Sequence, residues 1–124
     1  MGTRSRIGIQ NQNGSITSVY CHYDGYPEGV GQELIENYTS PVEVNELLSK
    51  GDMSSLHSKE FYKDRGETGV DATTSANEQD YLTDTNNCWG EFAYLYRDGE
   101  WEVCPTYGEG NKFTPVQALL KEEA

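Results

Sequence analysis

The densest run of chemically active side chains is YCHYDGYP at positions 20–27. It contains Cys21, His22 and Asp24, residue types that combine in nucleophilic and acid–base sites. Successive residues on a strand point to opposite faces, so Cys21 and His22 cannot hydrogen-bond to each other unless the strand bulges. We therefore expect Cys21 to be a small buried residue, and we assign no catalytic residue.

His22 and Asp24 would share a strand face, which makes them the only plausible acid–base pair of this run. The structural alternative is that Asp24 caps the following turn while His22 bonds to a backbone carbonyl. Both interpretations stay open at the level of sequence.

Two of the four arginines, Arg4 and Arg6, lie in the only part of the chain that is not acidic. Residues 1–27 carry a net charge of +1, which leaves −13 for the remainder. Guanidinium groups bind phosphates and carboxylates, and neighbouring tyrosine rings can stack on bases. We therefore predict a ligand-binding set whose members are Arg4, Arg6, His22, Tyr23, Asp24, Tyr26 and Arg65. The alternative is that the arginines pair with glutamates of the same chain.

The chain as a whole is acidic, with a formal net charge of −12 over 124 residues. DNA, RNA and anionic membranes attract clustered lysine and arginine, so the charge argues against all three as direct partners. It favours a protein with a basic surface, because carboxylates steer association with such a surface. The predicted contact surface includes the polar segment 57–87 and four glutamates, which are Glu33, Glu36, Glu43 and Glu46.

Neither a metal nor another cofactor is expected. The cysteines, Cys21, Cys88 and Cys104, are odd in number and lack C-x-x-C spacing, and His57 with its neighbouring carboxylates gives no known metal spacing. The sequence offers no apolar run for a membrane span or a signal peptide. These features together favour a reducing cytoplasm.

Two dipeptides, Asn13-Gly14 and Asp98-Gly99, favour type I′ turns and so predict two β-hairpins. The first hairpin is expected over 4–23 and the second over 92–104. A two-residue turn at 13–14 places Ile7 opposite Tyr20 and Ile9 opposite Ser18. The expected core face of this hairpin consists of Ile7, Ile9, Ile16 and Tyr20. The opposite face consists of Arg4, Arg6, Val19, Cys21 and Tyr23.

In the second hairpin, Tyr94 is expected to face Val103, and Tyr96 to face Trp101, across the ladder. Helices are predicted over 27–38, 41–50 and 115–122, each beginning with a proline. The fold class is therefore α+β, with an antiparallel sheet of two hairpins packed against two or three short helices, in a single domain spanning 1–124. Segment 57–87 shows no sustained apolar period and is predicted as a long polar loop, with a short strand near 70–75. A loop of that length signals either a functional segment or an undetected element.

Four motifs resemble those of a family of small proteins encoded by phages and prophages. They are TRSRIGI (3–9), YCHYDGYPEGVG (20–31), GDMSSL (51–56) and YLYRDGEW (94–101). The resemblance covers most of the chain. The family has no settled biochemical activity, so what it implies is a genomic setting, in which small accessory proteins often act on host defence.

Three functional hypotheses are consistent with these patterns. The first is a non-enzymatic, anti-CRISPR-like inhibitor that binds a host defence protein through its acidic surface. The second is a sponge or small hydrolase for a nucleotide signal, with an Arg/Tyr/His cleft where the first hairpin meets the loop at 64–67. The third is a structural accessory domain that forms homo-oligomers through a Tyr/Trp patch.

Overall fold

A computed structural model of the chain describes residues 3–107 and 112–122. The strands are β1 Ser5–Gln10, β2 Ile16–Cys21, β3 Met53–Ser55, β4 Glu60–Phe61, β5 Thr73–Ser75, β6 Phe92–Arg97, β7 Glu100–Pro105 and β8 Thr114–Pro115. The helices are η1 Pro27–Gly31, α1 Gln32–Asn37, α2 Pro41–Ser49, η2 Tyr62–Arg65, α3 Glu78–Asn87 and α4 Val116–Glu122.

The strands form one sheet in the order β4-β3-β2-β1-β6-β7-β8, and β5 pairs with the same edge of β2 as β3 does. The predicted α+β class is confirmed. The sheet is mixed, however, because the first strands of the two hairpins, β1 and β6, run parallel to each other. A turn signal specifies the pairing inside a hairpin, whereas the direction in which two hairpins join depends on the intervening 70 or so residues.

The first hairpin has the predicted strands but a different register. Asn11 and Ser15 close a three-residue loop in which the Gly14 N–H donates to the Asn11 carbonyl (3.0 Å) and Gly14 is left-handed (φ +88°). Ile7 therefore pairs with Val19 and not with Tyr20. The predicted register was wrong because a type I turn followed by a left-handed glycine accommodates Asn-Gly as well as a type I′ turn does.

This shift by one residue reverses the two faces of β2. Val19 and Cys21 lie with Ile7 in the main core, whereas Ile16 packs on the opposite face of the sheet. Tyr20 pairs with Arg6, so these two side chains share that opposite face. The predicted separation of Arg6 from Tyr20 is corrected accordingly.

The second hairpin forms as predicted. Asp98 and Gly99 both have positive φ, which is the type I′ conformation, and Tyr94 pairs with Val103. Tyr96 pairs with Trp101.

The predicted helices are confirmed, with small changes at their ends. Residues 27–37 begin with a π-helical turn and continue as α1. In α2, the Ser40 hydroxyl accepts a hydrogen bond from the Glu43 N–H (3.3 Å), and the Glu43 carboxylate accepts one from the Thr39 N–H (3.1 Å). This arrangement is a variant of the capping box. The C-terminal helix begins one residue late because Thr114 and Pro115 pair with β7.

Segment 57–87 contains three elements that the sequence pattern did not reveal, which are β4, η2 and α3. Helix α3 begins after Asn77, whose side chain accepts a hydrogen bond from the Asp80 N–H (2.8 Å). Only Tyr81 and Thr85 of this helix are buried, so it presents too few apolar residues to show a helical period. The prediction of a long loop was wrong for 60–65 and for 78–87, while the strand expected near 70–75 corresponds to β5.

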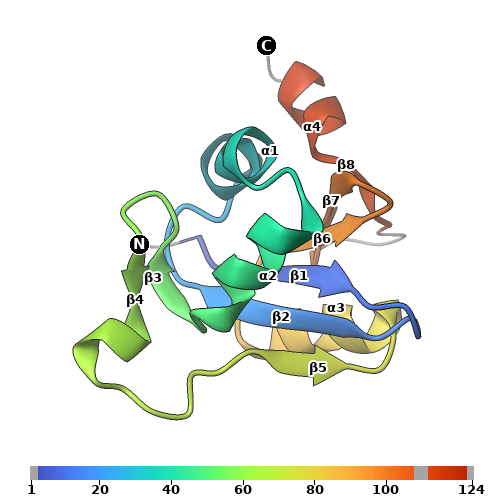
Figure 1. Cartoon of the computed structure of the whole chain (residues 1–124). Coiled ribbons are helices and arrows are strands. Elements are labelled where there is room, and N and C mark those ends of the chain that lie inside the picture. The colour runs from blue at the N-terminus through green and yellow to red at the C-terminus, as the bar shows by residue number, and fades with distance from the viewer. Residues whose placement is uncertain (1–2, 108–111, 123–124) are drawn as a thin grey trace.

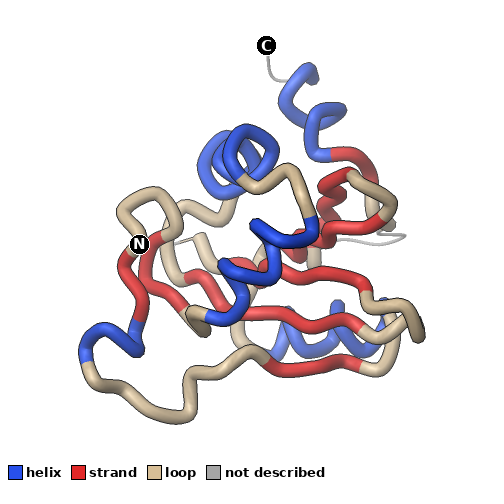
Figure 2. Tube along the Cα trace, viewed as in Figure 1, coloured by secondary structure: helices blue, strands red, loops and turns tan. Residues whose placement is uncertain are grey.

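Helices cover both faces of the sheet, as Figures 1 and 2 show. Helix α2 lies in front of β1 and β2 in Figure 1 and buries Val44, Leu47 and Leu48 in the main core. Helix α3 lies behind the sheet, where Tyr81 packs with Ile16. The turns and loops that connect the sheet to these helices carry the residues of the sites described below.

Candidate functional site

A cavity of about 300 Å³ lies between the turn at 23–28, helix α1 and the loop after β3. We call it the acidic pocket and define it by two exposed tyrosines and four carboxylates, which are Tyr23, Asp24, Tyr26, Glu28, Glu33 and Glu36. Val30 and Leu56 add apolar surface to the same lining, and His57 is its only imidazole. Among the described residues, no lysine or arginine contributes to the lining.

The turn that carries Tyr23 and Tyr26 is held from the core. The phenol of Tyr94, on β6, donates a hydrogen bond to the Gly25 carbonyl (2.6 Å). The Gly25 N–H in turn donates to the Thr3 carbonyl (2.8 Å), which joins the turn to the start of β1. The two tyrosines are therefore presented by a fixed backbone.

The first turn of the following helix brings further carboxylates to the cavity. Asp24 is left-handed (φ +59°), and its carbonyl accepts a hydrogen bond from the Val30 N–H (2.8 Å). The backbone of Gly29 passes so close to this carbonyl that a Cβ at position 29 would overlap it. Glycine at this position thus permits the tight entry that places Glu28 beside α1.

The carboxylates of α1 are oriented by neighbouring side chains. Glu33 accepts a hydrogen bond from the Asn37 amide (2.8 Å), and its other oxygen lies 3.4 Å from Nδ1 of His57. Glu36 accepts one from the Gln32 amide (2.5 Å). Amide donors orient a carboxylate without neutralising it, so the negative charge of the cavity is retained.

The electrostatic potential in the pocket is negative. The charge of Asp24 raises the pKa of the Tyr26 phenol, and so does the hydrogen bond from the Tyr26 hydroxyl to Oδ1 of Asp24 (3.3 Å). Such a potential disfavours a phosphate and favours a cation. Tyrosine rings next to carboxylates are the groups that recognise ammonium and guanidinium ions.

The predicted ligand-binding set is divided by the structure. Tyr23, Asp24 and Tyr26 line the acidic pocket, but none of the predicted arginines does. Arg65 lies on η2, where its guanidinium is 3.5 Å from the carboxylate of Glu60 and lies over the ring of Tyr62. This contact agrees with the alternative that the arginines pair with glutamates of the same chain.

Arg6 is buried, and its guanidinium is used inside the protein. Nε donates to the Ser18 hydroxyl (2.9 Å), and Nη2 donates to the Ser18 carbonyl (3.1 Å) and to the Thr73 hydroxyl (2.8 Å). Because these partners lie on β2 and β5, Arg6 joins three strands. Arg4 lies two residues earlier on the same face and is half-buried.

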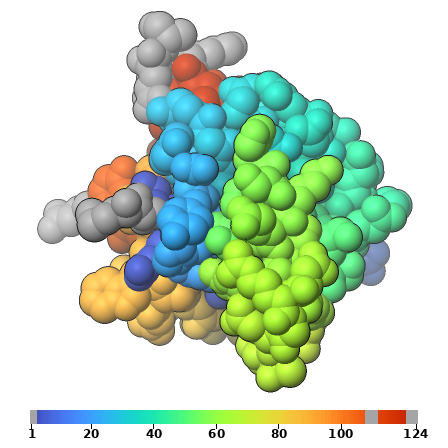
Figure 3. Space-filling view, turned by 90° about the vertical axis from the view of Figure 1, so that its left-hand side faces the viewer, coloured from blue at the N-terminus to red at the C-terminus, as the bar shows by residue number. Residues whose placement is uncertain are grey.

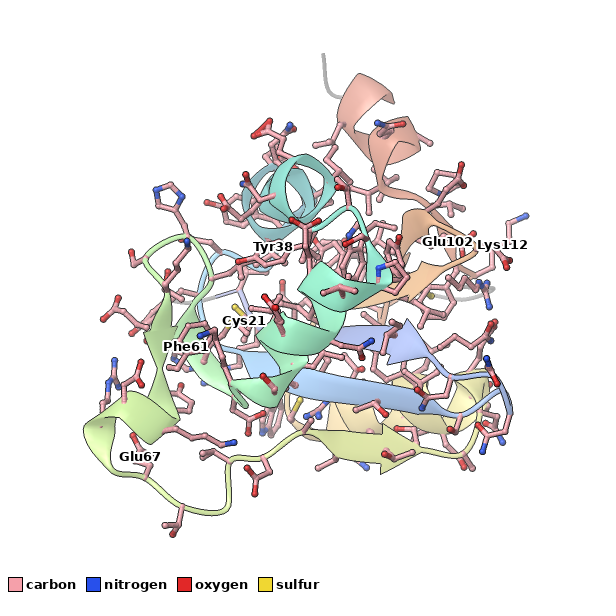
Figure 4. All side chains as sticks on the ribbon, viewed as in Figure 1. Cys21, Tyr38, Phe61, Glu67, Glu102 and Lys112 are labelled. Atoms are coloured by element: carbon pink, nitrogen blue, oxygen red, sulfur yellow. The ribbon has the colours of Figure 1, made fainter. Side chains whose placement is uncertain are left out.

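The side chains of the predicted acid–base pair have different partners. Nδ1 of His22 is hydrogen-bonded to the Tyr20 hydroxyl (2.7 Å), whereas Oδ1 of Asp24 accepts from Tyr26. Cys21 lies in the core, as Figure 4 also shows, and burial raises the pKa of its thiol to about 11. A thiol in this state is a poor nucleophile at neutral pH.

The four glutamates predicted as a partner surface are divided between two cavities. Glu33 and Glu36 line the acidic pocket. Glu43 and Glu46 line a second cavity of about 450 Å³ that also contains Lys50 and Lys59. Tyr38 and Phe61, both labelled in Figure 4 near α2, belong to this second lining. The second cavity touches α1 only at Asn37, so the four predicted glutamates are divided between α1 and α2.

Sequence reasoning missed Glu28 and His57 as lining residues of the acidic pocket, and it missed Trp89 entirely. Glu28 directly follows the YCHYDGYP run, and this position could have identified it as a lining residue from the sequence. His57 reaches the pocket only because the loop after β3 folds against α1. Trp89 is 77% exposed at the end of α3, a helix that the sequence pattern did not predict.

Among residues 3–107 and 112–122, no group of three or more His, Cys, Asp or Glu side chains is arranged to hold a metal ion. No helix within the same residues has the length and apolar composition needed to cross a bilayer. No protein-family model, curated protein or solved structure matches the chain.

Proposed function

We propose that the chain is a non-enzymatic inhibitor, encoded by a phage or prophage, that binds a basic surface of a host defence protein in the host cytoplasm. The observation that carries the proposal is the acidic pocket, where two exposed tyrosines and four carboxylates meet without a lysine or arginine.

The size and chemistry of the pocket fit the end of one lysine or arginine side chain. A volume of about 300 Å³ is at the small end of ligand cavities, and the tyrosine rings supply faces on which a guanidinium group can stack. The carboxylates of Glu33 and Glu36 are already oriented, so little side-chain entropy is lost on binding.

Carboxylates outside the pocket extend the complementary surface. Glu43 and Glu46 follow along α2, and charges at the rim of an interface mainly increase the association rate. Binding to a basic partner should consequently weaken as ionic strength rises.

The proposal is tested by titrating the full chain with an oligo-arginine peptide and measuring affinity by calorimetry. Replacing Glu28 and Glu33 by glutamine removes two charges from the pocket while keeping its shape, and should weaken binding about tenfold or more. The matched control replaces Glu67 and Glu100, which are exposed and outside the pocket, by glutamine. Figure 4 shows Glu67 on the loop after η2, away from α1.

A functional assay then addresses inhibition. Phage growth is compared in a defence-bearing strain that expresses the native chain, the Tyr26→Ala variant or the control pair at Glu67 and Glu100. The native chain and the control pair should restore growth, whereas Tyr26→Ala should not. Equal loss of peptide affinity in pocket and control variants, or no effect of the native chain on phage growth, would refute the proposal.

A further inference from the structure

A second surface carries chemistry that the proposed function does not use. It lies where the C-terminal end of α3 meets the start of β1, and we call it the Trp89 surface; its members are Arg4, Tyr20, His22 and Trp89. Figure 3 views this side of the molecule, with the orange-yellow end of α3 projecting beside the blue N-terminal segment.

The indole of Trp89 is exposed on a fixed and strained backbone. Trp89 is 77% exposed, and its φ of +64° lies in the left-handed region that normally selects glycine at the end of a helix. The Gly90 N–H donates to the Thr85 carbonyl (2.8 Å), and a Cβ at Gly90 would lie 2.7 Å from Cγ2 of Thr85. A large aromatic side chain that is exposed to water on a strained backbone is a structural outlier, and such outliers cluster at functional sites.

Arg4 is joined to this helix end by the backbone. The Glu91 N–H donates to the Arg4 carbonyl (2.7 Å). Glu91 follows Trp89 by two residues, so this bond holds the chain just after Trp89 against the start of β1. The Arg4 side chain is half-exposed, and among the described residues no carboxylate lies within ion-pair distance of it. Its forked donors are therefore available to an anion.

His22 is the second donor of the surface. Ser5 pairs with Cys21 at the end of the ladder, so Arg4 and His22 are the next residues outward, and Arg4 lies close enough to Tyr20 for its charge to act on the pKa of that phenol. The Tyr20 hydroxyl lies 2.7 Å from Nδ1 of His22, and burial raises the pKa of Tyr20 to about 12, so this hydroxyl keeps its proton. When Tyr20 donates to Nδ1, the proton of the neutral imidazole resides on Nε2.

We propose that the Trp89 surface binds a nucleotide, with the base stacked on the Trp89 indole and the phosphate held by the Arg4 guanidinium and the Nε2–H of His22. Exposed aromatic rings beside cationic donors bind bases and phosphates of any sequence. The locally positive segment 1–27 favours this anion even though the remainder of the chain carries −13. The site lacks both Arg6 and Arg65, which have partners elsewhere.

Tryptophan fluorescence can report on the site, because one of the two tryptophans is exposed and the other is buried. Trp101 is 5% exposed and its indole N–H donates to the Tyr38 carbonyl (2.7 Å), so quenching by an added base reports on Trp89. The full chain is titrated with GMP, guanosine and inorganic phosphate, and affinity is measured in parallel by calorimetry. GMP should quench the emission and bind more tightly than either fragment, with a Kd of about 1 mM or below.

Variants locate the contacts. Arg4→Ala should weaken GMP binding about tenfold, because a charge-assisted phosphate contact is lost, whereas Lys50→Ala, on the opposite face of the sheet, should leave it unchanged. Glu91→Gln should strengthen it by removing an adjacent negative charge. Trp89→Phe should abolish the quenching.

Three results would overturn the proposal. They are the absence of GMP binding, equal affinities for GMP and guanosine, and equal effects of Arg4→Ala and Lys50→Ala. A host protein that is captured through Trp89 in the absence of GMP binding would instead make this surface a protein-docking site.

Discussion

The hydroxyl of Tyr81 lies directly over the backbone of Gly8. A Cβ at Gly8 would lie 3.0 Å from this hydroxyl and 2.9 Å from Cγ2 of Ile16, while the hydroxyl itself donates to the Tyr94 carbonyl (2.6 Å). The absence of a Cβ at Gly8 thus allows α3 to pack against the sheet.

Gly8→Ala should lower the free energy of unfolding by about 1–3 kcal/mol, because the added methyl group overpacks this contact. Denaturation in urea measures the change. Thr83→Ala, at an exposed position of α3, is the control and should alter stability by less than about 0.5 kcal/mol. An unchanged midpoint for Gly8→Ala would contradict the close packing of Tyr81.

Arg6→Ala should destabilise the attachment of β5 to β2, with a cost of about 2 kcal/mol for the lost charged hydrogen bonds. Amide hydrogen exchange should then increase across Thr73–Ser75 while remaining slow in the second hairpin. GMP binding by the folded variant should persist. If its affinity falls as far as in Arg4→Ala, Arg6 is a ligand contact and the structural role assigned to it is wrong.

Trp89→Gly should stabilise the protein by about 1 kcal/mol, since glycine adopts the left-handed conformation without strain. Trp89→Ala keeps the Cβ and should show no such gain. Thermal unfolding of both variants measures the difference. A loss of stability in Trp89→Gly would mean that the indole makes contacts that outweigh the strain.

Asp52→Asn should change how stability depends on pH. The Asp52 carboxylate accepts from the Tyr20 N–H (2.8 Å), and burial raises its pKa above the ordinary 3.8, although this bond and the charge of Arg6 act in the opposite direction. The folded state therefore holds the proton more tightly than the unfolded state does. Relative to Asp52→Asn, the native chain should gain stability as pH falls from 7 toward about 4. Unfolding curves at several pH values give this difference, and a gain in the opposite direction would show that hydrogen bonding outweighs burial.

Alkylation at pH 8 should select one cysteine. Burial raises the pKa of Cys21 and Cys104 to about 11, which leaves about 0.1% of each thiol ionised. Cys88 is half-exposed and should react first, as read by mass spectrometry of tryptic peptides. All three should react in denaturant. Rapid labelling of Cys21 in the native protein would show that the main core opens.

Local patterns were sufficient to predict several elements. Asp98-Gly99 and its flanking aromatic residues determine the second hairpin within a dozen positions, and Ser40, Pro41 and Glu43 mark the start of α2. In each case the residues that form the interaction are neighbours in sequence, so propensity and spacing contain the information. Tyr23, Asp24 and Tyr26 were recognised for the same reason, as a dense polar run at a turn.

The remaining features depend on contacts between distant segments. Gly14 permits two loop geometries, and packing of Val19 with Ile7 selects between them by burying one face of β2. Helix α3 has too few apolar residues to be recognised alone and is stabilised by Tyr81 against Gly8. The sequence by itself therefore determined the hairpins, the capped helix and the polarity of the chain. Only the tertiary structure decided that Arg6 bonds to β5, that His57 joins the acidic pocket and that the chain after α3 meets the start of β1, because each depends on a contact between residues separated by dozens of positions.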